Sequence, residues 1–125
     1  ILFCHATPRS DTELFTERTP EGRTVAAFDG VTSSLVVCGH THMPFDRIIG
    51  ARRVVNAGSV GMPFAAVGAE WLLIGDGIEH RHTAYDLASA AARICATAYP
   101  LREHFASHHV LAVPGAEAMF AAFER

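Results

Sequence analysis

The stretch Leu35-Val36-Val37-Cys38-Gly39-His40-Thr41-His42 joins an apolar, β-branched run to two histidines that stand two positions apart. The run at 35–38 has the composition of a buried strand. On an extended strand, side chains two positions apart point to the same side. We therefore expect the rings of His40 and His42 to leave the end of this strand in one direction, toward a metal ion or an anionic substrate. Gly39 permits a close backbone approach or a bend at this point.

Length and composition exclude several classes of protein. The 125 residues suffice for one domain or part of one, and the chain is 50% apolar and 18% charged, as in globular proteins. The net charge of −3 argues against general nucleic-acid binding, which needs a basic face. No apolar stretch reaches the roughly 20 residues of a membrane-spanning helix, so we expect no membrane partner. The three cysteines lack the spacing of a disulfide framework, which favours a reduced, cytoplasmic chain.

Apolar runs and turn residues predict strands in the first 85 residues. Gly50-Ala51 and Asp76-Gly77 each stand between two β-rich runs and are typical of hairpins. The predicted strands span residues 1–4, 34–38, 45–49, 52–55, 70–74 and 78–83.

Helical signals stand between the first two strands. Ser10 or Asp11 could cap a short helix over 11–18. Thr19-Pro20 predicts the start of a second short helix, with the threonine as cap and the proline at the first helical position. That helix would turn three apolar side chains inward: Val25, Ala26 and Phe28.

The pattern becomes helical after Tyr85. Asp86 is a good N-cap for a helix whose apolar residues continue to Ala98, and further helices are predicted over 101–107 and 116–124. We expect residues 1–85 to form one domain and residues 86–125 to form a helical extension packed on it. The order of elements indicates a mixed α/β (α+β) fold.

Three histidines stand at predicted strand ends: His5, His40 and His42. If the strands before them are parallel neighbours, the three rings meet at one edge of a sheet, where open α/β sheets place their ligand sites. Imidazole is a common ligand for Zn, Mn, Fe and Ni. We favour metal binding over the alternative that these histidines are hydrogen-bonded rim residues.

Other candidate ligands carry weaker signals. His80 and His82 repeat the spacing of two, but in a polar hairpin arm that is more typical of a solvated strand face. Cys4 and Cys38 each lie close to a candidate histidine, so a Cys/His zinc site is an alternative, although no C-x-x-C pair supports it.

Three segments occur in the order and at the spacing of a known family. They are Phe3-Cys4-His5, Gly39-His40-Thr41-His42 and Asn56-Ala57-Gly58-Ser59-Val60-Gly61. Together they resemble the C-terminal half of a calcineurin-like metallophosphoesterase, in the branch of small bacterial phosphodiesterases and phosphatases. The resemblance implies the C-terminal half of a four-layer αββα sandwich with a helical tail. It also implies a centre of two divalent ions (Mn, Fe, Zn or Ni) whose bridging hydroxide hydrolyses a small phosphate ester.

The resemblance also implies roles for individual residues. By motif, His5 and His40 would ligate one metal and His42 the other. The loop that starts at Asn56 would pack beside the site, with Asn56 itself outside the ligand set.

The family's other motifs, D-x-H, G-D-x-x-D and G-N-H, are absent from this sequence. They supply the bridging carboxylate, further ligands and the histidine that assists the leaving group, so we assign no catalytic residue and no substrate contact. Because the chain starts within an apparent strand at Ile1, we expect sequence to be missing upstream. The chain would then pair with that N-terminal half or with itself. The alternatives are a non-catalytic truncated or degenerate chain and a mononuclear zinc-binding module that uses His5, His40 and His42.

Overall fold

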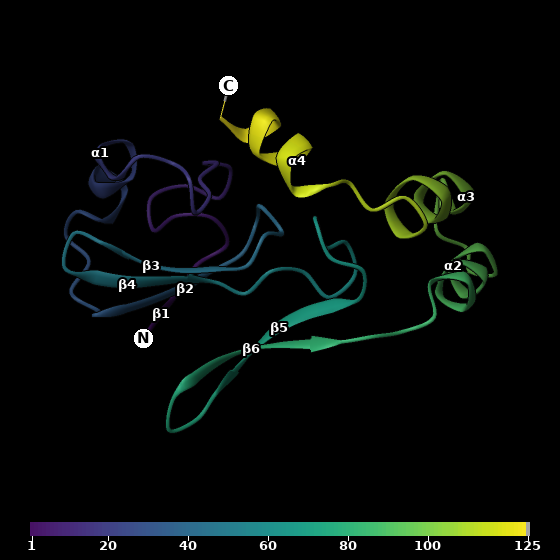
Figure 1. Cartoon of the computed structure of the whole chain (residues 1–125), viewed down its shortest axis with the longest axis horizontal. Coiled ribbons are helices and arrows are strands. Elements are labelled where there is room, and N and C mark those ends of the chain that lie inside the picture. The colour runs from purple at the N-terminus through teal and green to yellow at the C-terminus, as the bar shows by residue number, and fades with distance from the viewer. Residues whose placement is uncertain (125) are drawn as a thin grey trace.

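The computed structural model describes residues 1–124 and consists of a four-stranded sheet, a two-stranded hairpin and several short helices (Figure 1). The sheet contains β1 (Leu2–Phe3), β2 (Leu35–Cys38), β3 (Phe45–Ile49) and β4 (Arg52–Asn56), in the spatial order β1-β2-β4-β3. The hairpin contains β5 (Ala69–Ile74) and β6 (Ile78–Thr83) and lies below the sheet in Figure 1. The expected mixed α/β class is confirmed.

The sheet places two strand ends side by side. β1 runs parallel to β2, with Leu2 opposite Val36, and β2 runs parallel to β4. β3 returns antiparallel to β4 through a tight turn, in which Gly50 has a φ of 59°. Because β1 and β2 are parallel neighbours, the residues that follow them meet at one edge.

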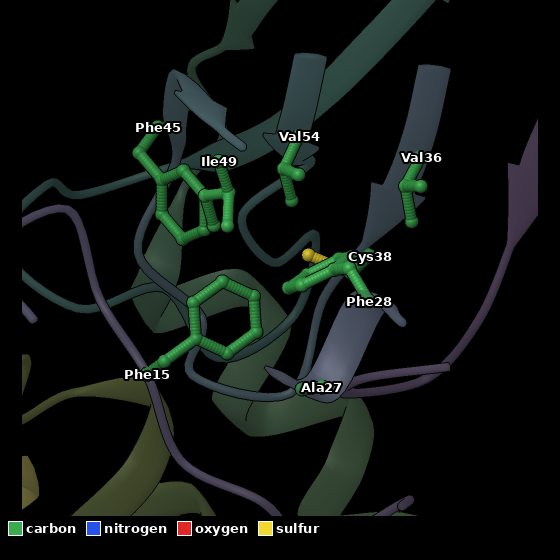
Figure 2. Close-up of a cluster of buried hydrophobic side chains, with 8 residues drawn as sticks. All are labelled: Phe15, Ala27, Phe28, Val36, Cys38, Phe45, Ile49 and Val54. Carbon is green, nitrogen blue, oxygen red and sulfur yellow. The ribbon is translucent and has the colours of Figure 1, made fainter. Parts of the chain in front are cut away.

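The core lies between one face of this sheet and the segment from Phe15 to Phe28, as Figure 2 shows. The ring of Phe15 meets Phe28 and Phe45 edge-on, with centroids 6.0 and 5.5 Å apart. Val36 and Val54 project from neighbouring strands onto these rings and are fully buried. Complete burial of such side chains stabilises the fold by about 1.5–3 kcal/mol each.

The predicted helix over 11–18 is wrong, because this segment is a loop. Its backbone amides are taken by neighbouring hydroxyls: Thr12 donates to the Oγ of Ser10, and Thr16 donates to the Oγ1 of Thr19. Short polar side chains of this kind compete with helical hydrogen bonds. The loop also carries Phe15 into the core, which a regular helix need not do.

The helix predicted after Thr19 forms, but it faces differently from expectation. α1 (Glu21–Thr24) passes directly into a 3-10 helix, Val25–Phe28. Phe28 is buried as predicted, whereas Val25 and Ala26 are exposed. The tighter winding of a 3-10 helix changes which positions face the core, so Ala27 is buried instead.

The tail contains α2 (Leu87–Cys95), α3 (Arg102–Phe105), a π-helix (Ala106–Val110) and α4 (Ala116–Phe123). The side chain of Asp86 accepts a hydrogen bond from the amide of Ser89, so the predicted cap of α2 is confirmed. Within residues 1–124, no helix is long and apolar enough to cross a membrane.

The tail touches the first 85 residues through α4 and the segment before it. Ala65 donates a backbone hydrogen bond to Pro114, and the rings of Phe64 and Phe123 lie 6.1 Å apart. The division of the chain at residue 85 stays a prediction. Arg125, the last residue of the expected extension, lies outside the described residues.

Candidate metal centre

The parallel pairing of β1 and β2 brings His5 and His40 together. The Nε2 of His5 and the Nδ1 of His40 are hydrogen-bonded at 3.0 Å, and the rings meet edge-on at 4.8 Å. The backbones are equally close, because the amide of Gly39 donates to the carbonyl of His5 at 2.9 Å. The sequence prediction that strand pairing would join these two histidines is therefore matched by the structure.

His42 does not leave the strand in the way expected. β2 ends at Cys38, and both His40 (φ 66°) and His42 (φ 58°) adopt the left-handed backbone conformation, so the assumption of an extended strand through both residues is wrong. Such positions cost about 1–3 kcal/mol each and cluster at functional sites. The Nδ1 of His42 lies 2.8 Å from the carbonyl of Met62, and its ring stacks on Phe64 with centroids 5.1 Å apart.

Asn56 holds this turn in place. Its side chain, fully buried at the end of β4, donates from Nδ2 to the carbonyl of Gly39 at 2.6 Å and to the Oγ1 of Thr41 at 3.0 Å. Its Oδ1 accepts from the amide of Gly58 at 2.9 Å. The sequence indicated only a loop packed beside the site. The available signal was an asparagine two residues before a glycine, the pattern of an Asx turn.

His80 and His82 lie on the exposed strand β6, as predicted for a solvated strand face, and each also makes one hydrogen bond within the protein. The Nε2 of His80 donates to the backbone carbonyl of Asn56 at 2.9 Å. The Nδ1 of His82 lies 2.7 Å from the carboxylate of Glu70 on β5. These contacts tie the β5–β6 hairpin to itself and to the end of β4.

Comparison with known proteins identifies the family. Residues 1–75 match the calcineurin-like phosphoesterase superfamily domain. The chain belongs to this superfamily. The motif residues His5, His40, His42 and Asn56 all lie within the matched part of the phosphoesterase domain.

A solved structure supports the fold of the phosphoesterase domain. The crystal structure of a hypothetical protein from Pyrococcus horikoshii OT3 superposes with a TM-score of 0.67 at 17% identity, over 89% of this chain and 46% of that chain. The present chain thus spans about half the length of that protein. A comparison with curated proteins found no match.

The histidines of this phosphoesterase domain have donor atoms suited to a metal. Two nitrogens that bind one ion at right angles, each at 2.0–2.1 Å, are about 3 Å apart, which agrees with the 3.0 Å between His5 and His40. A carbonyl only accepts, so the Nδ1 of His42 carries the proton in its bond to Met62 and leaves Nε2 free as a donor atom. Within residues 1–124, no group of three or more His, Cys, Asp or Glu side chains is arranged to hold a metal ion.

The surroundings of the site favour the neutral form of the His40 imidazole and the protonated form of the Cys4 and Cys38 thiols. Burial and the neighbouring ring of His5 lower the pKa of His40, against a hydrogen bond with the backbone of Thr12. A neutral imidazole is the form that binds a metal. Burial raises the pKa of Cys4 and raises that of Cys38 to about 12. Zinc binds thiolate rather than thiol, so a Cys/His site would have to deprotonate these cysteines, whereas the lowered pKa of His40 favours the neutral imidazole that binds a metal.

Proposed function

We propose that this chain supplies the histidine ligands of a metal centre that hydrolyses phosphate esters. The observation that carries the proposal is the 3.0 Å contact between the Nε2 of His5 and the Nδ1 of His40, at the carboxyl edge of two parallel strands. In this proposal His5 and His40 bind one divalent ion and His42 binds a second. Imidazole ligands are compatible with Mn, Fe, Zn or Ni at either position.

The chemistry follows from the superfamily and from the chain's own residues. Divalent ions at such a centre polarise the phosphoryl group and lower the pKa of bound water. The chain's part is to orient the rings: Met62 fixes the tautomer of His42, and Asn56 fixes the turn that carries both His40 and His42. A small phosphate ester is the proposed substrate.

The carboxylate ligands of this centre would come from residues outside the present sequence. On the sheet face opposite the core, Phe3 (64%) and Ile48 (62%) are exposed on the two edge strands, β1 and β3, whereas Val37 and Val55 between them are buried. Exposed apolar residues favour association with another layer of structure. We assign the exposed edges of this face to the other half of the sandwich, with self-association of the chain as the outcome where that half is absent.

Hydrolysis of bis-p-nitrophenyl phosphate by the full-length protein, in the presence of Mn²⁺, tests the proposal. We expect His42→Ala to abolish turnover and EDTA to abolish it reversibly. The matched control is His109→Gln, a histidine of the tail outside the matched domain. Turnover that survives both His42→Ala and chelation would exclude the proposed centre.

A mononuclear zinc-binding module of His5, His40 and His42 is the second candidate, because all three histidines belong to this chain. Metal analysis of the isolated chain and of its His5→Ala variant separates this module from the phosphoesterase centre. About one zinc per chain that His5→Ala removes, without phosphatase activity in the full-length protein, supports the module, and no zinc that depends on His5 excludes it.

A further inference from the structure

Three histidines gather in the tail, on residues that the family match does not cover. The rings of His104 and His108 stack with centroids 4.2 Å apart and an interplanar angle of 12°. The ring of His109 lies 6.0 Å from that of His104. His104 and His108 are exposed, whereas His109 is half-buried and lies 5.3 Å from Phe105.

The π-helix explains why this cluster forms. Its hydrogen bonds run from residue i to residue i+5, as in the bond from the amide of Leu111 to the carbonyl of Ala106 at 3.0 Å. The wider turn places the fourth and the fifth residue after His104 near it, and these residues are His108 and His109. Short π segments are rare in helices and occur frequently at functional sites.

The hydrogen bonds of His108 prepare one nitrogen for a ligand. Its Nδ1 lies 3.1 Å from the backbone carbonyl of His104 and 2.8 Å from the Oγ of Ser107. Because a carbonyl only accepts, Nδ1 carries the proton and Nε2 keeps a free lone pair. A backbone carbonyl behind the ring is the usual outer partner of a histidine that binds a metal.

We propose that His104 and His108 chelate one borderline divalent ion of the Zn²⁺, Cu²⁺ or Ni²⁺ class. Two imidazoles four residues apart lie on one face of a helix. The hydrogen bonds of His108 hold its ring in place, and rotation of the His104 ring about its Cβ–Cγ bond, a soft torsion, turns a ring nitrogen of His104 toward the ion at the Nε2 of His108. Imidazole selects these ions over Mg²⁺. No group of three such ligands exists within residues 1–124, so the remaining coordination positions are open to water or to a ligand from another molecule.

The site is separate from the histidines of the phosphoesterase domain and is tested without any activity. Zn²⁺ is titrated into the ¹⁵N-labelled chain while the histidine ring signals are followed by NMR. We expect the signals of His104 and His108 to shift together with one apparent dissociation constant, and Mg²⁺ to leave them unchanged. Signals that stay in place up to millimolar Zn²⁺, or that move with different constants, would overturn the proposal.

Substitutions assign the ligands. Loss of an outer partner alone costs about 10–100-fold in metal affinity, so we expect His108→Ala to weaken the Zn²⁺ response of His104 at least tenfold. His104→Phe keeps an aromatic ring against residue 108 while removing both ring nitrogens. It should weaken the Zn²⁺ response of His108 at least tenfold. His109→Gln is the matched control and should leave the affinity within about twofold. An unchanged response of His104 in His108→Ala contradicts the chelate even if the helix is otherwise intact.

Discussion

The side-chain amide of Asn56 donates to the backbone carbonyl of Gly39 at 2.6 Å, and so joins the end of β4 to the turn that follows β2. Both His40 and His42 hold left-handed backbone conformations in that turn. Strained conformations persist only where the surrounding structure determines them. The buried amide of Asn56 therefore positions both histidines, although it touches neither ring.

Asn56→Ala should lower the free energy of unfolding by about 3 kcal/mol, since it leaves buried polar partners without hydrogen bonds. Those partners are the carbonyl of Gly39, the Oγ1 of Thr41 and the amide of Gly58. Urea unfolding of the chain measures the loss. Thr41→Val is the matched control, because it removes one of the three bonds at constant volume and should cost clearly less. Equal losses for the two variants would mean that Thr41 alone carries the effect.

The bidentate pair between Asp46 on β3 and Arg53 on β4 predicts a pH dependence. The hydrogen bond and charge of Arg53 hold the pKa of Asp46 below its usual range, against the opposing effect of burial. A carboxyl with a lowered pKa stabilises the fold above its unfolded pKa of about 3.9, and loses this contribution as the pH falls through the folded value. The side chains are 36% and 44% exposed, so the contribution is small.

We therefore expect Asp46→Asn to lower the urea midpoint slightly at about pH 7 and by less at about pH 3, because the contribution is lost as the pH falls through the folded pKa of Asp46. The same substitution in an Arg53→Gln background is the control and should have no effect at either pH. A difference as large in acid as at neutral pH would assign the effect to the hydrogen bond rather than to the charge.

Cys38 should resist alkylation in the native chain. Its side chain is buried in the same cluster as Phe28 (Figure 2), and burial raises its pKa to about 12. Thiolate is the reactive form, so iodoacetamide at about pH 8 should modify the half-buried Cys95 first and leave Cys38 intact. Peptide mass spectrometry reads the order, and concentrated urea should make all three cysteines reactive. Modification of Cys38 as rapid as that of Cys95 in native buffer would contradict the burial.

The strands and hairpins were predictable because their signals are local. Gly50-Ala51 and Asp76-Gly77 mark turns that form as expected, and Asp86 caps α2. The loop over 11–18 was not predictable in this way. Hydrogen bonds between hydroxyls and backbone amides replace helical ones in this segment. Only the tertiary structure shows that Phe15 belongs to the core.

The sequence indicated where the candidate site lies, at the ends of two strands, but not the backbone conformation of the turn that carries His40 and His42. Two apolar runs that each lead to a histidine indicated the location on the condition that their strands pair in parallel. β1 and β2 pair in this way, and the pairing places His5 against His40. The left-handed turn at His40 and His42 depends on Asn56, which lies 15 residues beyond Thr41 in the chain. The extended strand through His40 and His42 was predicted from the local alternation of residues, and this alternation does not depend on a side chain as distant in sequence as Asn56.

The attachment of α4 should depend on Arg18. Its guanidinium carbon lies 3.8 Å from the centroid of the buried Phe120 ring, and its nitrogens donate to Glu117 at 2.9 and 2.5 Å. Arg18→Ala should therefore increase hydrogen exchange of the α4 amides several-fold relative to those of α2, because the cation–π contact and the ion pair are lost together.

Glu117→Gln separates the two contributions to the attachment of α4. It removes the charge from an exposed pair and keeps Arg18 on the ring of Phe120. Exposed ion pairs contribute little, so exchange in α4 should change much less than in Arg18→Ala. An increase as large as that of Arg18→Ala would make the ion pair the main link between α4 and the loop that carries Arg18.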